Sequence, residues 1–558
     1  MYPRLSISVL ILLISSEIFG LEGAQDIAPK TCVSDGCLRG RSFTSYGGKR
    51  YEAYLGVPFA KPPVDKLRFK NPVPVEPWTG DYDASFERSK CVQKNDIWLN
   101  PKVEGSEDCL YLNLYKPVTP KNPEKPMAVM VFIHGGGYFS GSASMGEFGP
   151  DRLMDTEEVI LVVIQYRLGV FGFFSTGDQA ATGNFGLKDQ SAALRWVQRN
   201  IAQFGGDPAL VTLLGQSAGG ASVQMHMMSP LSKGLFSRAV VMSGSALGFW
   251  NQPIKEPLKF AQQQAESVGI TAPASMSSEE LVDALRQVDA IKLGESIDKL
   301  KFWFIYPIAP YHSVIEKHVD NETFISEDPS IVWARGGYHP IPWRTGFVPN
   351  EGTFASLAII TNASLVAELN EHSSSYIPRI FGCKENEKSR KMLRERFFPD
   401  GTDEHWITDA NLNNLQQAFS EAYITYAIAM SVKQYANHET TKNPLDLYYF
   451  NFKGNHSHSK FATNSGSDYG VCHSDDLSYL FRSKDLFDDF EPNSPEAAMS
   501  EKLVEYYTQF AYDGVTNPTC RKKCEIQEFT NDVNQPFKIN SIDGFDQEMV
   551  AFWTEIYK

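Results

Sequence analysis

A serine in the middle of the chain stands in a context that suits nucleophilic attack on a carbonyl carbon. The apolar run LVTLLG at residues 210–215 leads into Gln216-Ser217-Ala218-Gly219, and a helix-like stretch follows. The pattern G-x-S-x-G between a strand and a helix forms a sharp turn that exposes the serine oxygen. Small residues must flank this serine because the backbone crowds together there. The sequence therefore predicts Ser217 as a catalytic nucleophile.

A glycine-rich turn earlier in the chain supplies a second element that such a nucleophile needs. The apolar run at 129–133 ends in His134-Gly135-Gly136-Gly137. Backbone N–H groups of such a turn, with the amide that follows the nucleophile, stabilise the negative charge that develops on the carbonyl oxygen. We therefore expect the amides of Gly136, Gly137 and Ala218 to form an oxyanion hole.

The sequence around these motifs predicts the scaffold that positions them. Short runs rich in Val, Ile and Leu occur at 128–134, 159–166 and 210–215. Such runs are typical of strands buried on both faces of a parallel sheet. The stretch 189–204 carries apolar residues at helical spacing, so the alternation predicts an α/β fold with a central, mostly parallel sheet and helices on both faces. Residues from about 250 to 345 fit either substrate-covering insertions or a further part of the same domain.

The composition is that of a globular protein and argues against one class of partner. The 558 residues include 52 basic and 67 acidic side chains, which gives a formal net charge of −15 at pH 7. The isoelectric point is about 5.3. Binding to nucleic acid depends on clustered Lys and Arg side chains that release counterions from the phosphates. We therefore expect no nucleic-acid partner.

The ends of the chain and its cysteines indicate an extracellular protein. Residues 1–20 combine a basic residue with an apolar run too short to span a bilayer, which predicts a secretory signal peptide followed by a single catalytic domain at 21–558. A buried N-terminal helix is the alternative. The C-terminal sequence EMVAFWTEIYK is not typical of a membrane anchor. Eight cysteines and sequons at Asn321, Asn362 and Asn455 fit a secreted glycoprotein.

Two longer motifs carry a family resemblance. Residues 204–219 read FGGDPALVTLLGQSAG, and residues 107–113 read EDCLYLN. Both resemble the signatures of the type-B carboxylesterase family, which includes the cholinesterases, and further similarity covers nearly the whole chain after the signal peptide. The resemblance implies an α/β-hydrolase fold with a catalytic triad in the order Ser, acid, His.

The same resemblance identifies the other two members of the triad. The turn FVPNEGTFA points to Glu351 as the acid, and the turn GVCHSDD points to His473 as the base. Asp476 also matches an acidic position of the family, and we expect it to orient the loop. Such a triad cleaves an ester through an acyl-enzyme that water then hydrolyses. The implied partners are a small ester and water, with no metal and no organic cofactor.

Family similarity also implies a disulfide between Cys91 and Cys109, which closes a loop in front of the active-site gorge. Cys32 and Cys37 flank a short turn that allows a local disulfide. Cys472, beside the predicted base, is expected to be free, and the pairing of the other cysteines stays open. The pair His456 and His458 is interpreted as part of a solvated loop rather than as a metal site.

The substrate is less defined than the chemistry. A finer resemblance rests on Gln216 in the serine motif, Arg68-Phe69, Asp189-Gln190, Glu351, the segment from Gly470 to Asp476, and the basic residues Lys188, Arg195 and Arg199. These features are similar to those of juvenile hormone esterases, which implies a hydrophobic methyl ester as substrate. A broad or detoxifying carboxylesterase is the close alternative. Acetylcholine is disfavoured, and Trp98 is interpreted as gorge lining or core. A non-catalytic adhesion or binding protein of the same fold is the alternative from another class.

Overall fold

The apolar runs of the sequence form the centre of one large sheet. In the part of the chain that the computed structural model describes, this sheet has eleven strands. From one edge to the other they are β16 (Lys538–Ser541), β15 (Glu525–Phe529), β14 (Leu445–Phe450), β13 (Trp343–Phe347), β12 (Arg238–Met242), β11 (Gly206–Gln216), β9 (Met127–Ile133), β10 (Val159–Ile164), β8 (Tyr111–Pro117), β4 (Arg50–Pro58) and β3 (Arg41–Thr44). In this order, each strand from β15 to β10 pairs in parallel with the next. The outer pairs are antiparallel: β16 with β15 at one edge, and β10 with β8, β8 with β4 and β4 with β3 at the other.

The structure describes residues 28–95, 102–438, 445–463, 467–515, 525–531, 538–541 and 545–558. The predicted signal peptide at 1–20 and Trp98 lie outside these residues, as do Cys520 and Cys524. Among the described residues, no helix is both long enough and apolar enough to cross a membrane.

Successive side chains of each central strand point to opposite faces of the sheet and contribute to two apolar cores, one on each face. On β9, Val129 and Val131 belong to one apolar cluster, together with Trp196. The intervening Met130 and Phe132 belong to a second cluster on the opposite face. Successive side chains of a strand point to opposite faces, so a strand that reads as a continuous apolar run must be covered on both sides.

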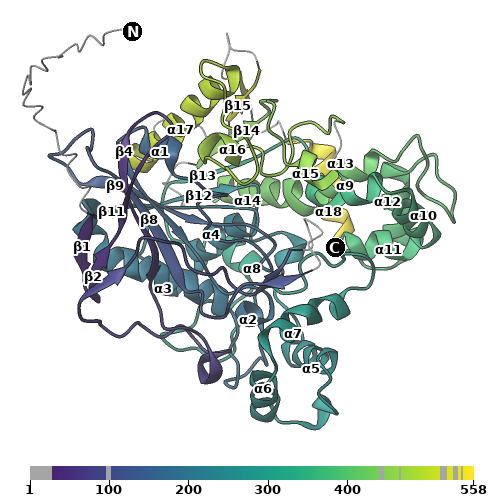
Figure 1. Ribbon diagram of the computed structural model, residues 1–558. Helices are drawn as coiled ribbons and strands as arrows, with labels where there is room; N and C mark the ends of the chain where they lie inside the picture. Colours follow the sequence, from purple (N-terminus) through teal and green to yellow (C-terminus); the bar gives the residue numbers. More distant parts are fainter. Residues whose placement is uncertain are drawn as a thin grey trace, which may run out of the picture.

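Helices provide that cover, as Figure 1 shows. Contacts with the strands place α1 (Asp151–Met154) and α17 (Pro495–Asp513) against β9, β10 and β11, and α3 (Phe185–Asn200) and α4 (Ala218–Met228) against β11. Next to α4 lie α8 (Pro329–Ala334) and α14 (Tyr426–Ala436). The predicted α/β fold with helices on both faces is thereby confirmed, and the helix predicted at 189–204 begins earlier and ends in a 3₁₀ turn, η2 (Ile201–Phe204).

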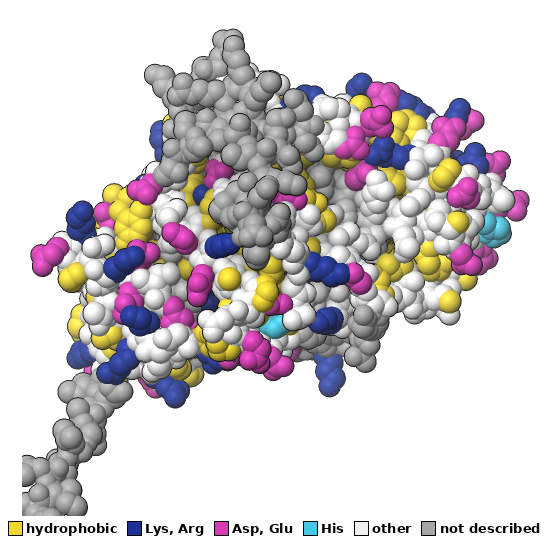
Figure 2. Space-filling view, turned by 90° about the horizontal axis from the view of Figure 1, so that it is seen from above, with side chains coloured by type: hydrophobic (Ala, Val, Ile, Leu, Met, Phe, Trp, Pro, Cys, Tyr) yellow, Lys and Arg dark blue, Asp and Glu magenta, His cyan; other side chains and the backbone are white. Residues whose placement is uncertain are grey.

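Two helical groups extend from this layered body in Figure 1. One lies at the bottom of the view and comprises α5 (Pro257–Ser267), α6 (Ser278–Arg286) and α7 (Ala290–Glu295). The other lies at the right and includes α9 (Thr353–Ile360), α10 (Ala363–Glu371), α11 (Ser373–Ile380), α12 (Glu387–Phe397), α13 (Asn414–Ser420), the π-helical turn η7 (Glu421–Thr425) and α18 (Gln547–Ile556). On the face in Figure 2, basic and acidic side chains are interspersed.

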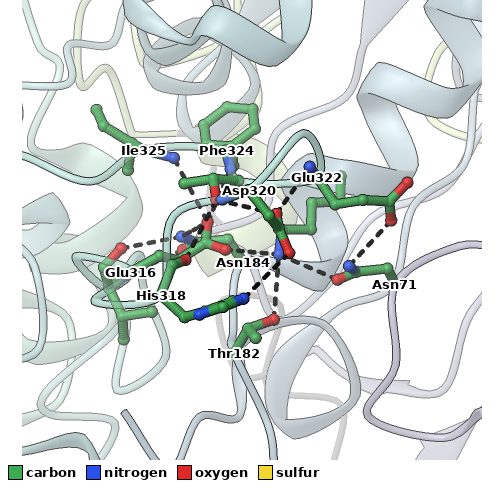
Figure 3. Close-up of polar contacts among 12 residues, drawn as sticks. Asn71, Thr182, Asn184, Glu316, His318, Asp320, Glu322, Phe324 and Ile325 are labelled. Atoms are coloured by element: carbon green, nitrogen blue, oxygen red, sulfur yellow. Dashed lines mark hydrogen bonds and ion pairs between the residues drawn. The ribbon is translucent and has the colours of Figure 1, made fainter. Parts of the chain in front are cut away.

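A buried ion pair holds one of the long connections against the body. The Lys188 ammonium donates to the Glu316 carboxylate at 2.6 Å, and both side chains are only 2% exposed. The other Glu316 oxygen accepts from the Asn184 amide and from the Phe324 N–H, each at 2.9 Å (Figure 3). Because every partner is itself hydrogen-bonded, this network fixes the segment 314–325 to the start of α3.

We predict that Glu316→Gln destabilises the protein by about 3–5 kcal/mol, because the Lys188 ammonium stays buried without its counter-charge. The free energy of unfolding in urea measures the effect. Glu256→Gln is the control, since Glu256 and Lys259 form an ion pair with side chains 71% and 64% exposed, and such pairs contribute about 0–1 kcal/mol. Equal stability of the wild type and Glu316→Gln would contradict this role of the pair.

Candidate active site

The predicted nucleophile lies at the junction of β11 and α4, in a strained backbone conformation. Ser217 has φ 58° and ψ −122°, a backbone conformation that residues other than glycine rarely adopt. Its N–H donates to the Met242 carbonyl on β12 at 2.9 Å, and its carbonyl accepts from Ala221 at 2.9 Å. The turn is held from both sides, and Ser217 lines a cavity of about 400 Å³.

The small residues of the motif are required by close backbone approaches. A Cβ atom at Gly219 would lie 2.1 Å from the Ile133 carbonyl oxygen, and one at Gly215 would lie 2.4 Å from the Gly219 carbonyl oxygen. Neither contact is sterically possible, so the helix can start this close to β9 only with glycine at both positions.

The glycine-rich turn lies directly beside the serine. Strands β9 and β11 pair in parallel with Ile133 opposite Gly215, so the residues that follow each strand are neighbours. Gly136 and Gly137 have φ of 96° and 60°, which favours glycine. Both glycines line the cavity with Ser217, while Ala218 follows the serine as the first residue of α4.

His134 holds the base of this turn. Its ring stacks on Tyr166 with centroids 4.5 Å apart, and its Nδ1 lies 2.9 Å from the Gly135 carbonyl oxygen. The Tyr166 hydroxyl donates to the His134 carbonyl at 3.0 Å. Burial lowers the pKa of His134 to about 4, so the imidazole is neutral at physiological pH. His134 therefore acts as a packed support of the turn.

The two residues predicted as acid and base lie in contact. Glu351 follows β13, and His473 follows β14 at the same end of the sheet, where Asn350 and Cys472 form a parallel bridge. One Glu351 oxygen lies 2.5 Å from Nδ1 of His473, and the other accepts from the Val348 N–H at 2.9 Å. Glu351 is fully buried and His473 is 7% exposed.

Contacts with neighbouring residues hold the histidine loop in place. The Thr353 hydroxyl accepts from the His473 N–H at 3.3 Å, and the Phe354 ring centre lies 4.8 Å from the imidazole. Asp476 is fully buried and accepts from the Tyr448 hydroxyl at 3.1 Å. The structure thus places Asp476 where it ties the loop to β14.

The cavity above the serine is walled largely by apolar side chains from segments far apart in the sequence. Trp250, Ile308 and Ala309 come from the long middle stretch, so part of it does border the cavity. Further apolar wall residues that no local motif identified are Phe148, Phe354, Leu357, Tyr423, Ile424, Leu477 and Leu486. The arrangement can seat an apolar molecule with one reactive group at Ser217.

Comparison of the chain with known protein families identifies its family. The model of the carboxylesterase family matches residues 28–553. The chain belongs to the carboxylesterase family. Juvenile hormone esterase from Tribolium castaneum is 40% identical over 504 residues, which cover 88% of this chain and 84% of that protein. Venom carboxylesterase-6 from Apis mellifera is 33% identical over 522 residues, covering 92% and 90%.

A solved structure supports the same assignment. Juvenile hormone esterase from Manduca sexta, crystallised with OTFP covalently attached, matches with a TM-score of 0.81 and 27% identity over 95% of this chain and 99% of that chain. The predicted α/β-hydrolase fold is confirmed, and the chain is a carboxylic ester hydrolase with an ester as substrate.

Two disulfides of this carboxylesterase lie within the described residues. Cys91 is joined to Cys109, and Cys32 is joined to Cys37. Beside Cys91, the Gln93 amide donates to the Gly141 carbonyl and accepts from the Gly141 N–H, both at 2.8 Å. Among the described cysteines, Cys383 and Cys472 are free and buried, and burial raises the pKa of the Cys472 thiol to about 11.

His456 and His458 lie in a loop, as expected, but their rings are partly buried rather than solvated. The His456 ring stacks between Phe487 and Phe490, with centroids 4.6 Å from each. His458 is 11% exposed, pairs with Asp475 at 3.1 Å and lines the cavity. Aromatic and acidic partners from later in the chain partly cover both rings. Among the described residues, no group of three His, Cys, Asp or Glu side chains could hold a metal ion.

Several residues that support the finer resemblance are buried ion-pair partners outside the cavity lining. Arg68 pairs with Glu107 and donates to the Val288 carbonyl at 2.6 Å. Asp189 pairs with Arg167 at 2.7 Å. These pairs connect α3 and the disulfide loop to neighbouring segments, so their contribution to the site is structural.

We predict a pH-dependent stability difference for Asp476→Asn. Burial, reinforced by the Glu351 carboxylate, raises the pKa of Asp476 to about 7 from 3.8. The folded state therefore binds the extra proton between these values, and the wild type loses stability relative to the variant as the pH rises through that range. Above pH 7 the loss is complete, at roughly 2–4 kcal/mol.

Urea unfolding of both proteins at pH 5 and pH 8 measures this difference. Asp409→Asn is the control because Asp409 is exposed on a turn, and its effect is expected to stay constant. A pH-independent difference between wild type and Asp476→Asn would show that the buried carboxyl does not change its protonation on folding.

Proposed function

We propose that the protein is a serine esterase that cleaves hydrophobic esters through an acyl-enzyme, with Ser217 as nucleophile, His473 as base and Glu351 as acid. The observation that carries the proposal is the 2.5 Å contact between Glu351 and His473 at the cavity that Ser217 lines. A nucleophile, a base and a carboxylate that orients the base are the set that acyl transfer requires.

In this mechanism the Ser217 hydroxyl attacks the ester carbonyl while His473 takes its proton through Nε2. The Glu351 carboxylate holds the proton on Nδ1 and stabilises the imidazolium that forms. The amides of Gly136, Gly137 and Ala218 bind the oxyanion, and the loss of one such donor costs about 3–4 kcal/mol in related chemistry. His473 then protonates the leaving alcohol, and water repeats the sequence on the acyl-enzyme.

The walls of the cavity favour an apolar acyl group. Trp250, Phe354, Leu357 and Ile424 present apolar surface around the serine. Similarity to juvenile hormone esterases of two insects supports a hydrophobic methyl ester as the substrate, cleaved to an acid and methanol. A broad carboxylesterase is the second candidate, supported by the similarity to venom carboxylesterase-6.

We predict that Ser217→Ala lowers kcat for a nitrophenyl ester and for juvenile hormone by at least about 10⁴-fold, because the acyl-enzyme no longer forms. Purified wild type and variant are compared by product release at equal concentration. The ratio of kcat/KM between the two esters then decides the substrate, with a preference for the hormone expected. A preference for the short ester would favour the broad carboxylesterase.

Two outcomes would contradict the mechanism itself. Hydrolysis by Ser217→Ala at the wild-type rate would exclude Ser217 as the nucleophile. A folded wild type that cleaves neither ester would favour a non-catalytic binding role on the same fold.

We also propose that the protein is secreted after removal of residues 1–20, leaving 21–558 as one catalytic domain. Asn321, Asn362 and Asn455 are all exposed, which supports glycosylation at these sequons. Expression in insect cells is expected to yield a glycosylated protein in the medium whose mass falls on glycosidase treatment. Retention in the cell, or an N-terminus at Met1, would contradict secretion with signal cleavage.

A further inference from the structure

One side chain of the loop that the Cys91–Cys109 disulfide closes is bonded to the segment of the glycine-rich turn. Gln93 begins the short strand β6 (Gln93–Lys94) and is 5% exposed. Its amide nitrogen donates to the Gly141 carbonyl at 2.8 Å, and its amide oxygen accepts from the Gly141 N–H at 2.8 Å. The side-chain amide thereby makes the same pair of bonds with Gly141 that a neighbouring antiparallel strand would make.

Both hydrogen-bond donors of Gln93 are used within the protein. A glutamine amide carries two N–H donors. One bonds to the Gly141 carbonyl, and the other bonds to the Cys91 carbonyl at 3.1 Å. Although Gln93 lines the cavity, it therefore has no donor left for an ester, and any effect on the reaction must act through the backbone of Gly141.

Gly141 in turn lies against the start of the glycine-rich turn. A Cβ atom at Gly141 would stand 2.3 Å from Nδ1 of His134 and 2.7 Å from the Gly135 carbonyl oxygen, so only glycine fits there. The Gly135 carbonyl belongs to the same planar, trans peptide group as the Gly136 N–H, and the two bonds point in opposite directions. The contacts of Gly141 and His134 with this carbonyl therefore set the direction of the Gly136 N–H.

The next peptide group of the turn is fixed in the same way. The Gly136 carbonyl accepts from the Phe139 N–H at 3.1 Å, the Ser140 N–H at 3.0 Å and the Ser140 hydroxyl at 3.2 Å. These bonds hold the opposite end of that peptide group, which is the Gly137 N–H. Within the part of the chain that the structure describes, neither the Gly136 N–H nor the Gly137 N–H has an acceptor, so both are available to an oxyanion.

We propose that Gln93 is a positioning residue for the oxyanion hole. By holding Gly141 against His134 and Gly135, it fixes the peptide groups whose N–H donors bind the oxyanion. The role rests on the proposed function, in which the amides of Gly136 and Gly137 are those donors. Donors of this kind stabilise a transition state because they are already oriented before the reaction, so a side chain that fixes their orientation contributes to kcat without contacting the ester.

We predict that Gln93→Met, which keeps the length of the side chain but not its hydrogen bonds, lowers kcat for a nitrophenyl ester about tenfold with KM nearly unchanged. The reason is that a displaced turn weakens contacts that form only in the transition state. A trifluoromethyl ketone gives the second readout, because its hemiketal adduct with Ser217 places a negatively charged oxygen in the same hole. Its inhibition constant should rise by about the same factor as kcat falls.

Gly141→Ala tests the same contact from its other side, because the added Cβ would meet the His134 ring. It should change kcat and the inhibition constant together, as Gln93→Met does, and it carries the comparison if Gln93→Met does not fold. Gln263→Met is the matched control, since Gln263 is exposed on α5, and it should change neither constant. Circular dichroism and the urea midpoint establish that each variant is folded.

Two results would overturn the positioning role alone. One is a folded Gln93→Met variant whose kcat and inhibition constant both equal those of the wild type. The other is a lower kcat with an unchanged inhibition constant, which would place the loss outside the oxyanion hole. A wild type with no esterase activity would instead contradict the proposed function itself.

Discussion

The site depends on the close approach of two strand ends. β11 turns into α4 through Ser217, whose φ is positive at 58°, and Gly219 lies against the carbonyl of Ile133 at the end of β9. A side chain larger than hydrogen does not fit at that contact. Because β9 and β11 are neighbours in parallel register, the serine turn and the glycine turn are formed side by side, and every other group of the site is arranged around them.

The parallel sheet then gathers residues that are distant in sequence. Glu351 and His473 follow β13 and β14, whose carboxyl ends lie at the same edge as those of β9 and β11. The bridge between Asn350 and Cys472 holds the two turns side by side through the backbone. The short Glu351–His473 contact is thus a consequence of backbone pairing, which is why the fold supports this chemistry.

Buried ion pairs outside the cavity keep its walls in place. Lys188–Glu316 fixes the segment beyond Ile308 and Ala309, and Arg68–Glu107 ties the disulfide loop to the segment after α6. A buried charge is tolerated only when it is paired and hydrogen-bonded, so these pairs fix the path of long connections that have few strand or helix hydrogen bonds of their own. Backbone pairing within the sheet therefore holds the turns that carry Ser217, Glu351 and His473. Buried ion pairs hold the connections near the cavity walls.

The sequence by itself determined the parts of this protein that local sterics control. Short stretches of neighbouring residues were enough to predict Ser217 with its glycines, the glycine turn after β9 and the alternation of strands and helices. Family resemblance identified Glu351 and His473. Only the tertiary structure decided that Gln216 contacts His473, that aromatic rings stack on His456, and that Tyr423 and Ile424 form a wall of the cavity. These contacts join segments far apart along the chain. Sequence periodicity and spacing describe neighbouring residues only, so they do not predict a long-range contact between side chains.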